Sequence, residues 1–297
     1  HLTSFIGSET IPAIEASEDY YCMDAEKDLI ASTVPATEHS VMCAGGLEDE
    51  FGTFKRLITE TYPKGFVSIV SDTWDFWKVI SEFMPRLYDE IMTRDGRLVI
   101  RPDSGIPEDI ICGIPKENIL IIEDECYYIP NIGKADSIQI HTYTTKIKEN
   151  PKEYEKYKLS SYQIKGAYEC WWDIFGGVIN EKGYKVLDSH IGIIYGDSIT
   201  MDRQKEIYRR LEEKGFAATN LVLGIGSYTY QYRTRDNLSF AMKATWCQIN
   251  GEGKEIFKQP KTDSGMKNSL KGLIQVLQDE NGKYYAKDCV TKEEESN

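Results

Sequence analysis

The segment Leu98-Val99-Ile100-Arg101-Pro102-Asp103-Ser104-Gly105 places a short apolar run directly before a polar loop. The apolar run predicts a buried strand, and Pro102 and Gly105 predict the loop that leaves it. The Arg101 guanidinium offers a planar fork that suits phosphate, and the Asp103 carboxylate offers acceptors for a sugar diol or a hydrated magnesium ion. This combination predicts a site for a phosphorylated sugar at the end of a strand.

Three further apolar runs are followed by polar or glycine-containing loops. Phe66–Val70 precedes Ser71-Asp72, Ile191–Tyr195 precedes Gly196-Asp197, and Asn220–Leu223 precedes Gly224-Ile225-Gly226-Ser227. Helical patterns separate the runs: one covers about Thr73 to Met92, with a kink expected at Pro85, and another runs from an N-cap at Thr200 to about Lys214. Such alternation predicts a parallel barrel or a doubly wound sheet, and in a barrel the ends of the strands share one mouth. We therefore expect four loops to build one site.

Composition limits the class of protein. The 297 residues carry a net charge of −13, which argues against a general binder of nucleic acid or of anionic membranes, because both need a basic surface. The sequence has no apolar run of about 18 residues and no signal-peptide pattern at its start, so we expect a soluble chain. Its 7 cysteines are never arranged as C-x-x-C, which favours reduced thiols in the cytoplasm.

Two regions depart from the strand–helix alternation. Residues 123–160 are polar and aromatic, with a charged stretch from Lys146 to Lys158, and predict a peripheral insertion. From about Leu238 the pattern predicts strands at Phe240–Ile249 and Leu273–Leu277, with a hairpin turn at Asp279–Gly282. This part predicts a small antiparallel element.

A second motif, Val34-Pro35-Ala36-Thr37-Glu38-His39-Ser40, sets His39 beside an acid and a hydroxyl. An isolated histidine is often structural, yet imidazole is also the side chain best suited to accept a proton or a phosphoryl group near neutral pH. The motif alone leaves both roles open.

Six motifs occur in one order along the chain: His1-Leu-x-x-Phe5-x-Gly7-Ser-Glu-Thr10, Pro35–Ser40, Val67–Asp72, Ile100–Gly105, Tyr195–Asp197 and Thr234–Asp236. Together they resemble the nicotinamide phosphoribosyltransferase family across nearly the whole sequence. The family is longer at its N-terminus, so the chain resembles its C-terminal portion. The missing part includes the aromatic and Arg-containing segment that in the family sandwiches the nicotinamide ring and binds pyrophosphate.

The resemblance implies a fold as well as an activity. We expect an irregular TIM-like (β/α) barrel of the type II phosphoribosyltransferase kind over residues 1–237, with an insertion at about 123–180. Residues 238–297 would be the C-terminal segment of a second, mainly antiparallel β domain. The family further implies a homodimer, or assembly with the missing N-terminal part.

The implied reaction moves ribose 5-phosphate from phosphoribosyl pyrophosphate to nicotinamide, with Mg²⁺ on the pyrophosphate, and gives nicotinamide mononucleotide for NAD salvage. By the same resemblance, Arg101 holds phosphate or pyrophosphate, Asp103 anchors the ribose hydroxyls, and Pro102 belongs to the same substrate loop. The other implied contacts are Gly196 and Asp197 for ribose, Gly226, Ser227 and Arg235 for the 5′-phosphate, and Glu9 and Ser68 for the carboxamide. Where this chain has Glu9 the family usually has Asp.

His39 matches the histidine that the family phosphorylates with ATP as an activating co-substrate. Asp72 matches a site acid, and Lys243, Lys258 and Lys267 match basic residues that reach the phosphates across the family dimer. Each has an ordinary alternative in the residues themselves. Asp72 suits a helix N-cap, Gly224–Ser227 a tight turn, Arg235 a surface ion pair and the lysines a solvated face.

Three other functions stay open. A nicotinate phosphoribosyltransferase shares the architecture, although Glu9 should repel the carboxylate of nicotinate and attract an amide. A non-catalytic fragment could retain a phosphate pocket and a dimer surface. An unrelated magnesium-dependent barrel enzyme acting on sugar phosphates would need no role for His39.

Overall fold

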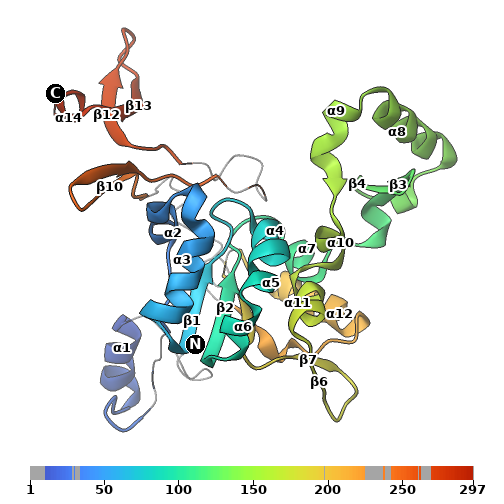
Figure 1. The fold of residues 1–297 in the computed structure, drawn as a ribbon, viewed down its shortest axis with the longest axis horizontal. Helices are drawn as coiled ribbons and strands as arrows, with labels where there is room; N and C mark the ends of the chain where they lie inside the picture. Colours follow the sequence, from blue (N-terminus) through green and yellow to red (C-terminus); the bar gives the residue numbers. More distant parts are fainter. Residues whose placement is uncertain are drawn as a thin grey trace.

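The computed structural model describes residues 11–28, 30, 34–196, 198–224, 237, 242–259, 261 and 269–296. It is a mixed α/β structure with one parallel sheet and several small antiparallel sheets. Helices α2 (His39–Gly45) and α3 (Glu50–Arg56) lie beside the parallel sheet, and the C-terminal hairpins and residues 119–159 project on opposite sides (Figure 1).

The parallel sheet has the order β1 (Lys64–Val70), β2 (Asp95–Arg101), β8 (Ile191–Tyr195) and β9 (Leu221–Leu223), and every neighbouring pair is parallel. Their register aligns one row of apolar residues across the sheet: Ile69, Ile100, Ile193 and Leu221. The predicted strands are confirmed. Because the strands are parallel, the loops after Val70, Arg101, Tyr195 and Leu223 leave from one edge.

The segment before α2 extends the sheet beyond β1. Ala36 forms a parallel bridge with Ser68, through Thr37 N–H donating to the Ser68 carbonyl and Ser68 N–H donating to the Pro35 carbonyl. The parallel sheet of the described residues contains four strands and this bridge. A closed TIM-like barrel, and the domain boundaries at 237 and 238, therefore remain predictions.

The predicted helix between Thr73 and Met92 is divided into α4 (Phe76–Lys78), the π-helical η3 (Val79–Phe83), α5 (Met84–Arg86) and α6 (Tyr88–Met92). The chain passes through Pro85 in the first turn of α5, and the break falls at Leu87, whose φ of −100° and ψ of 11° leave the helical region. Pro85 lies inside a continuous helical stretch, directly after the π-helical turn η3, and the interruption follows two residues later.

The main core lies between the parallel sheet and its helices. Its largest fully buried side chains include Trp171 and Tyr168 of α11 (Ala167–Phe175) and Tyr195 of β8. Helix α12 (Met201–Glu213) contributes Ile207 and Leu211 to this core, and the Thr200 side chain caps it as predicted, accepting from Arg203 N–H. Helix α11 falls within the insertion of about 123–180 that the family resemblance implies, yet its aromatic face belongs to the main core.

Residues 119–159 are ordered around a small core of their own. Strands β3 (Ile119–Ile122), β4 (Glu125–Tyr128) and β5 (Lys158–Leu159) form an antiparallel sheet, which packs on α8 (Ser137–Glu149) through Ile147. We call this unit the insertion subdomain. The charged stretch from Lys146 to Lys158 is divided between short elements, because Asn150 leaves the helical region and Pro151 opens α9 (Pro151–Tyr154).

Further short elements connect these parts. They are α1 (Ile11–Tyr21), η1 (Leu47–Asp49), η2 (Leu57–Thr61), α7 (Pro107–Cys112), η4 (Lys116–Asn118), η5 (Ile132–Lys134), η6 (Glu155–Tyr157), α10 (Ser161–Lys165), β6 (Gly177–Ile179), β7 (Lys185–Leu187) and η7 (Ala218–Asn220).

The C-terminal part forms two antiparallel hairpins, as its pattern predicted. Strand β10 (Trp246–Ile249) pairs with β11 (Glu252–Glu255), and β12 (Leu273–Gln278) pairs with β13 (Tyr284–Val290) before the short helix α14 (Lys292–Glu295). The strand expected from Phe240 begins at Trp246 among the described residues. None of the helices in the described ranges is long and apolar enough to cross a membrane.

Candidate active site

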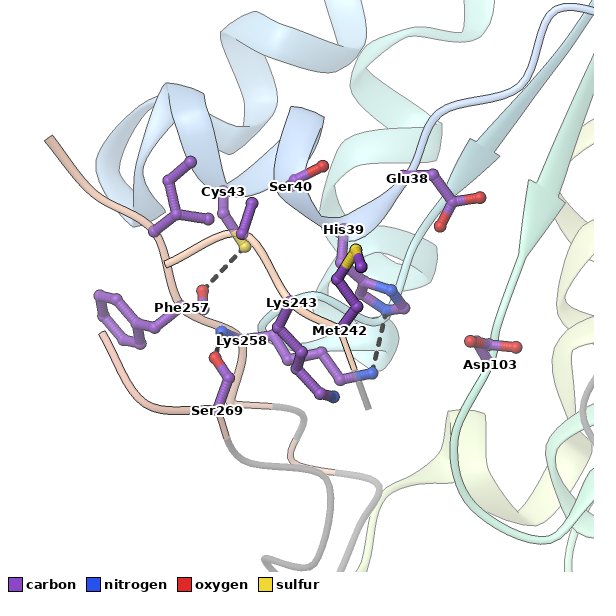
Figure 2. Close-up of a pocket in the computed structure, with 12 residues that line it drawn as sticks. Glu38, His39, Ser40, Cys43, Asp103, Met242, Lys243, Phe257, Lys258 and Ser269 are labelled. Carbon is purple, nitrogen blue, oxygen red and sulfur yellow. Dashed lines mark hydrogen bonds between the residues drawn. The ribbon is translucent and has the colours of Figure 1, made fainter. Parts of the chain in front are cut away.

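A cavity of about 290 Å³ opens at the carboxyl edge of the parallel sheet. It lies between the start of α2, the loop after β2 and the C-terminal segment of residues 242–258 (Figure 2). The residues that line it are Glu38, His39, Ser40, Cys43, Asp103, Met242, Lys243, Ala244, Ile256, Phe257, Lys258 and Ser269. Segments far apart in the sequence therefore share one cavity.

His39 is brought to the sheet edge by the backbone pairing of Pro35–Thr37 with β1, after which α2 begins at His39 itself. Asp72 follows β1 and is fully buried. The Nε2 atom of His39 lies 3.1 Å from Oδ1 of Asp72. Burial raises the pKa of Asp72, but the hydrogen bond and charge of His39, joined by Ser104 and Lys258, outweigh that effect and leave the pKa below its usual value. Asp72 is therefore an ionised partner for the imidazole.

The N-cap alternative for Asp72 is wrong. Helix α4 is capped by Asp75, whose side chain accepts a hydrogen bond from the backbone N–H of Lys78. The Oδ1 atom of Asp72 contacts His39 instead. The carboxylate therefore stays at the end of β1, beside the imidazole.

Lys258 brings a positive charge to the same histidine. Its Nζ lies 3.4 Å from Nε2 of His39, and the residue is buried (Figure 2). Its backbone N–H donates to the Ser269 hydroxyl, which fixes the lysine from its own segment. A buried ammonium group in a cavity is a ready partner for an anionic substrate.

The C-terminal segment is held on the α/β part by specific packing. The Phe257 ring meets Trp74 edge to face at 4.8 Å between ring centres, and the Cys43 thiol donates to the Phe257 carbonyl at 2.8 Å. Gln259 N–H donates to the Thr73 carbonyl, one residue beyond Asp72. Burial raises the pKa of Cys43 to about 12, so this thiol is a packing group and not a nucleophile.

The loop after β2 has its two key side chains in different places. Asp103 lines the cavity, whereas Arg101 points its Nη2 to the Thr37 carbonyl at 2.9 Å and to Glu38 Oε1 at 3.1 Å. The Nε of Arg101 is buried and has no hydrogen-bond partner among the described residues. Glu38 lines the cavity and Arg101 does not, so Arg101 lies behind Glu38.

Two contacts fix the neighbouring strand ends. The Tyr195 hydroxyl lies 2.9 Å from the Ser104 carbonyl and 3.2 Å from the Gly105 carbonyl, so the end of β8 ties down the loop after β2. Gly224 N–H donates to the Tyr195 carbonyl, and a Cβ on Gly224 would come within 2.8 Å of the Gly196 Cα. Only a residue without a side chain permits that approach. The strand ends lie at one edge as expected, but the described cavity lining takes only Asp103 from the four loops, so one site built by all four stays a prediction.

The structure brings some of the predicted residues together and leaves others apart. His39, Asp103, Lys243 and Lys258 line the cavity, and Asp72 contacts His39. Ser68 is buried within β1, Pro102 is buried in its loop, and Gly196 is exposed at the end of β8. Glu9, Asp197, Gly226, Ser227, Arg235 and Lys267 lie outside the described residues.

Sequence reasoning missed several cavity residues. Glu38 and Ser40 belong to the quoted His39 motif and could have been named from it, whereas Cys43, Met242, Phe257 and Ser269 carry no local signal. Within the described ranges, the structure has no cluster of three or more His, Cys, Asp or Glu side chains able to hold a metal ion.

Ligands of open α/β sheets commonly bind beyond the carboxyl ends of the strands, and a cavity there that offers His39, Lys243 and Lys258 suits an anionic ligand. The chain belongs to the nicotinate phosphoribosyltransferase (NAPRTase) family, whose model matches residues 1–294.

The chain is also similar to several curated proteins. The chain is 46% identical over 288 residues to the nicotinamide phosphoribosyltransferase of Acinetobacter baylyi, which covers 95% of this chain and 48% of that protein. It is 34% identical over 282 residues to the nicotinamide phosphoribosyltransferase of Mycoplasma pneumoniae, covering 93% of this chain and 50% of that protein. The protein of the same name from Mycoplasma genitalium is 32% identical over 291 residues. The chain spans about half the length of the curated relatives that it matches.

Proposed function

We propose that the protein containing this chain transfers ribose 5-phosphate from phosphoribosyl pyrophosphate to nicotinamide. The ring nitrogen of nicotinamide forms a bond to C1′ of the ribose, and the bond from C1′ to pyrophosphate oxygen breaks, its electron pair leaving with pyrophosphate. The product is nicotinamide mononucleotide for NAD salvage. The observation that carries the proposal is the cluster of His39, Asp72 and Lys258 beside the loop of Asp103.

The geometry supports a division of roles around the sugar. Charge becomes positive at C1′ and negative on the leaving pyrophosphate in the transition state, so fixed cations and dipoles give most of the help. Lys243 and Lys258 would meet phosphate oxygens in the cavity, with Arg101 close behind its wall, and Asp103 would accept hydrogen bonds from the ribose hydroxyls. By resemblance, Gly196 and Asp197 complete the ribose contacts, and Gly226, Ser227, Arg235 and Lys267 the phosphate contacts.

His39 would be phosphorylated by ATP as an activating co-substrate. In this proposal the ionised Asp72 accepts a hydrogen bond from Nε2–H, and Nδ1 is then the ring nitrogen with a lone pair. Nδ1 would bond to the γ-phosphorus as the bond to ADP breaks, giving a phosphohistidine and ADP. Lys258 lies where it can offset part of the added negative charge.

Magnesium would come to this site mainly on its substrate. Mg²⁺ is commonly held by one or two carboxylates together with phosphate oxygens, and Asp103 is the carboxylate that the cavity offers beside Glu38. This donor set fits an ion carried by pyrophosphate and does not form a protein cage. When bound, the ion would neutralise charge on the leaving group.

The base assignment rests on the relatives, which bear the name nicotinamide phosphoribosyltransferase. Glu9 and Ser68 are the proposed partners of the carboxamide, and a carboxylate at Glu9 disfavours nicotinate as the substrate.

We further propose that the sheet is part of a TIM-like barrel. The catalytic unit would be a homodimer, or an assembly with the N-terminal part that the family resemblance implies, in the cytoplasm. All seven cysteines are free thiols, which agrees with a reducing compartment.

The decisive experiment incubates the complete protein with phosphoribosyl pyrophosphate, Mg²⁺ and either nicotinamide or nicotinate, with and without ATP. Mass spectrometry should detect nicotinamide mononucleotide, and the yield should fall at least tenfold in His39→Gln when ATP is present. Exclusive conversion of nicotinate would refute the substrate assignment. Tight binding of phosphoribosyl pyrophosphate with no turnover of either base would favour a non-catalytic binding protein.

A further inference from the structure

A second cavity, of about 240 Å³, lies where the insertion subdomain meets helices α4 and α7. Among the described residues it shares no lining side chain with the first cavity. One of its walls is the loop after β2, through Gly105 and Ile106, and the first cavity uses Asp103 of the same loop. We call it the insertion cavity.

The inner wall of the insertion cavity is apolar and aromatic. Trp77 comes from α4, Ile106 and Ile110 from the start of α7, and Tyr128 and Tyr157 from the insertion subdomain. Aromatic rings offer flat faces on which another flat ring stacks, and planar ligands are commonly bound between such side chains and aliphatic ones. The wall therefore suits a planar ring.

Three lysines also line the cavity. They are Lys156, Lys158 and Lys261, and they come from two segments about a hundred residues apart. Lys158 Nζ lies 2.5 Å from Glu125 Oε1, and Lys261 Nζ lies 2.6 Å from Asp75 Oδ2. Such solvent-facing ion pairs are weak, so a phosphate can replace a carboxylate with little loss.

The acid within the cavity is neutralised by its own partner. Asp109 also lines the cavity, and its Oδ1 lies 2.7 Å from Nη1 of Arg210. Lys156 lies with its Nζ 5.0 Å from the Tyr157 ring centre, so the lysine charge stands beside an aromatic face. The cavity thus combines aromatic rings with three exposed lysines, of which Lys158 and Lys261 are ion-paired with Glu125 and Asp75.

We propose that the insertion cavity binds a mononucleotide, with its base against Trp77 and Tyr128 and its phosphate at Lys156 and Lys158. Its volume is near the lower end of ligand pockets, about 300 Å³, which fits a base and sugar with the phosphate at the rim. A ligand seated there would contact the loop of Asp103 from the side away from the first cavity. The site is independent of the reaction proposed above.

The test is calorimetric titration of the complete protein with AMP, adenosine and ribose 5-phosphate. AMP should bind, and each of the two partial ligands should bind at least tenfold more weakly. Lys156→Glu and Lys158→Glu should each weaken AMP binding about tenfold. Lys148→Glu is the matched control, because Lys148 belongs to the same subdomain, pairs with Glu123 and does not line the cavity.

Two results would overturn the proposal. One is the absence of detectable AMP binding at concentrations up to about 1 mM. Only a ligand with a dissociation constant well above about 1 mM would escape detection in that range. The other is AMP binding that is lost in Lys243→Glu of the first cavity and retained in both insertion variants. Photo-crosslinking with 8-azido-AMP gives an independent location: labelled peptides should include residues 156–159, and labelling confined to 34–45 or 242–259 would contradict the site. A protein that makes no nicotinamide mononucleotide could still pass this test.

Discussion

The Nε2 atom of His39 lies 3.1 Å from Oδ1 of the fully buried Asp72, although the two residues are 33 positions apart, with α2, α3 and β1 in that interval. The contact fixes the orientation of the imidazole, and an ionised Asp72 favours a proton on the nitrogen that faces it.

Replacing Asp72 with Asn should lower the ATP-dependent activity of the complete protein about 10- to 100-fold, because an amide does not hold the imidazole in the same tautomer. The measurement is ATP hydrolysis together with phosphohistidine content. Asp75→Asn is the control, since Asp75 is a nearby helix cap and does not contact His39. Equal activity of Asp72→Asn and the parent protein would remove the pair from the mechanism.

The Asp72→Asn variant should also differ from the parent protein in how its folding stability depends on pH. Because the pKa of Asp72 is lower in the folded state, its ionised form stabilises the fold above the unfolded value of about 3.9, and this stabilisation is lost as pH falls through the folded value. The stability difference between the parent and Asp72→Asn should therefore be constant at neutral pH and shrink below about pH 4. Chemical denaturation at pH 7, 5 and 3.5 measures it.

Glu50 should show the opposite dependence. Burial raises the pKa of Glu50 to about 7; Lys78 counteracts this effect, and the charges of Asp75 and Asp72 add to it. Its contribution to stability is thus complete below the unfolded value of about 4.3 and declines as pH rises to about 7. Glu50→Gln should stabilise the protein at pH 8 by roughly 1–3 kcal/mol and have little effect at pH 4. Equal effects at both pH values in thermal melts would contradict this account.

Lys258→Met should weaken the binding of phosphoribosyl pyrophosphate at least tenfold, because it removes a buried charge from the cavity and keeps most of the side-chain volume. A charge-assisted contact of this kind is worth about 1.5–3 kcal/mol. Lys254→Met, on the exposed strand β11, serves as the matched control. Calorimetry should separate the two variants, and similar dissociation constants would place Lys258 outside the substrate site.

Tyr195→Phe should raise the KM for phosphoribosyl pyrophosphate about fivefold, with a smaller change in kcat. The variant removes the hydroxyl that donates to the Ser104 and Gly105 carbonyls. This loss should destabilise the ordered conformation of the loop after β2 by about 1 kcal/mol. Tyr184→Phe removes a hydroxyl that donates to exposed Glu212 and should leave both constants unchanged. A fall in kcat alone would argue against a positioning role for Tyr195.

The strands were predictable because local patterns determine them. The apolar runs at Phe66–Val70, Leu98–Ile100 and Ile191–Tyr195 each match a strand of the parallel sheet within three residues at either end. The capping hydroxyl of Thr200 was equally local. A proline signal was less informative, since Pro85 continues the helix and the break falls at Leu87.

The site was only partly predictable, because its remaining contacts are made between distant segments. The motif around His39 indicated chemistry, but no spacing shows that Phe257 packs on Trp74 and so sets Lys258 beside the imidazole. The aromatic face of α11 was hidden for the same reason, since its amphipathic pattern does not say which core it joins.

The contact between His39 and Lys258 joins residues 219 positions apart. Bringing residues so far apart in the sequence together costs conformational entropy, which is offset only when the segments between them have folded. We therefore expect this contact to be among the last to form and the first to open. Partial loosening of the C-terminal hairpins would thus take the lysine away while the parallel sheet and the His39–Asp72 pair stay in place. Lys258 therefore reaches the cavity only while the C-terminal segment is packed in place, and a protein with an intact sheet can still lack this lysine beside His39.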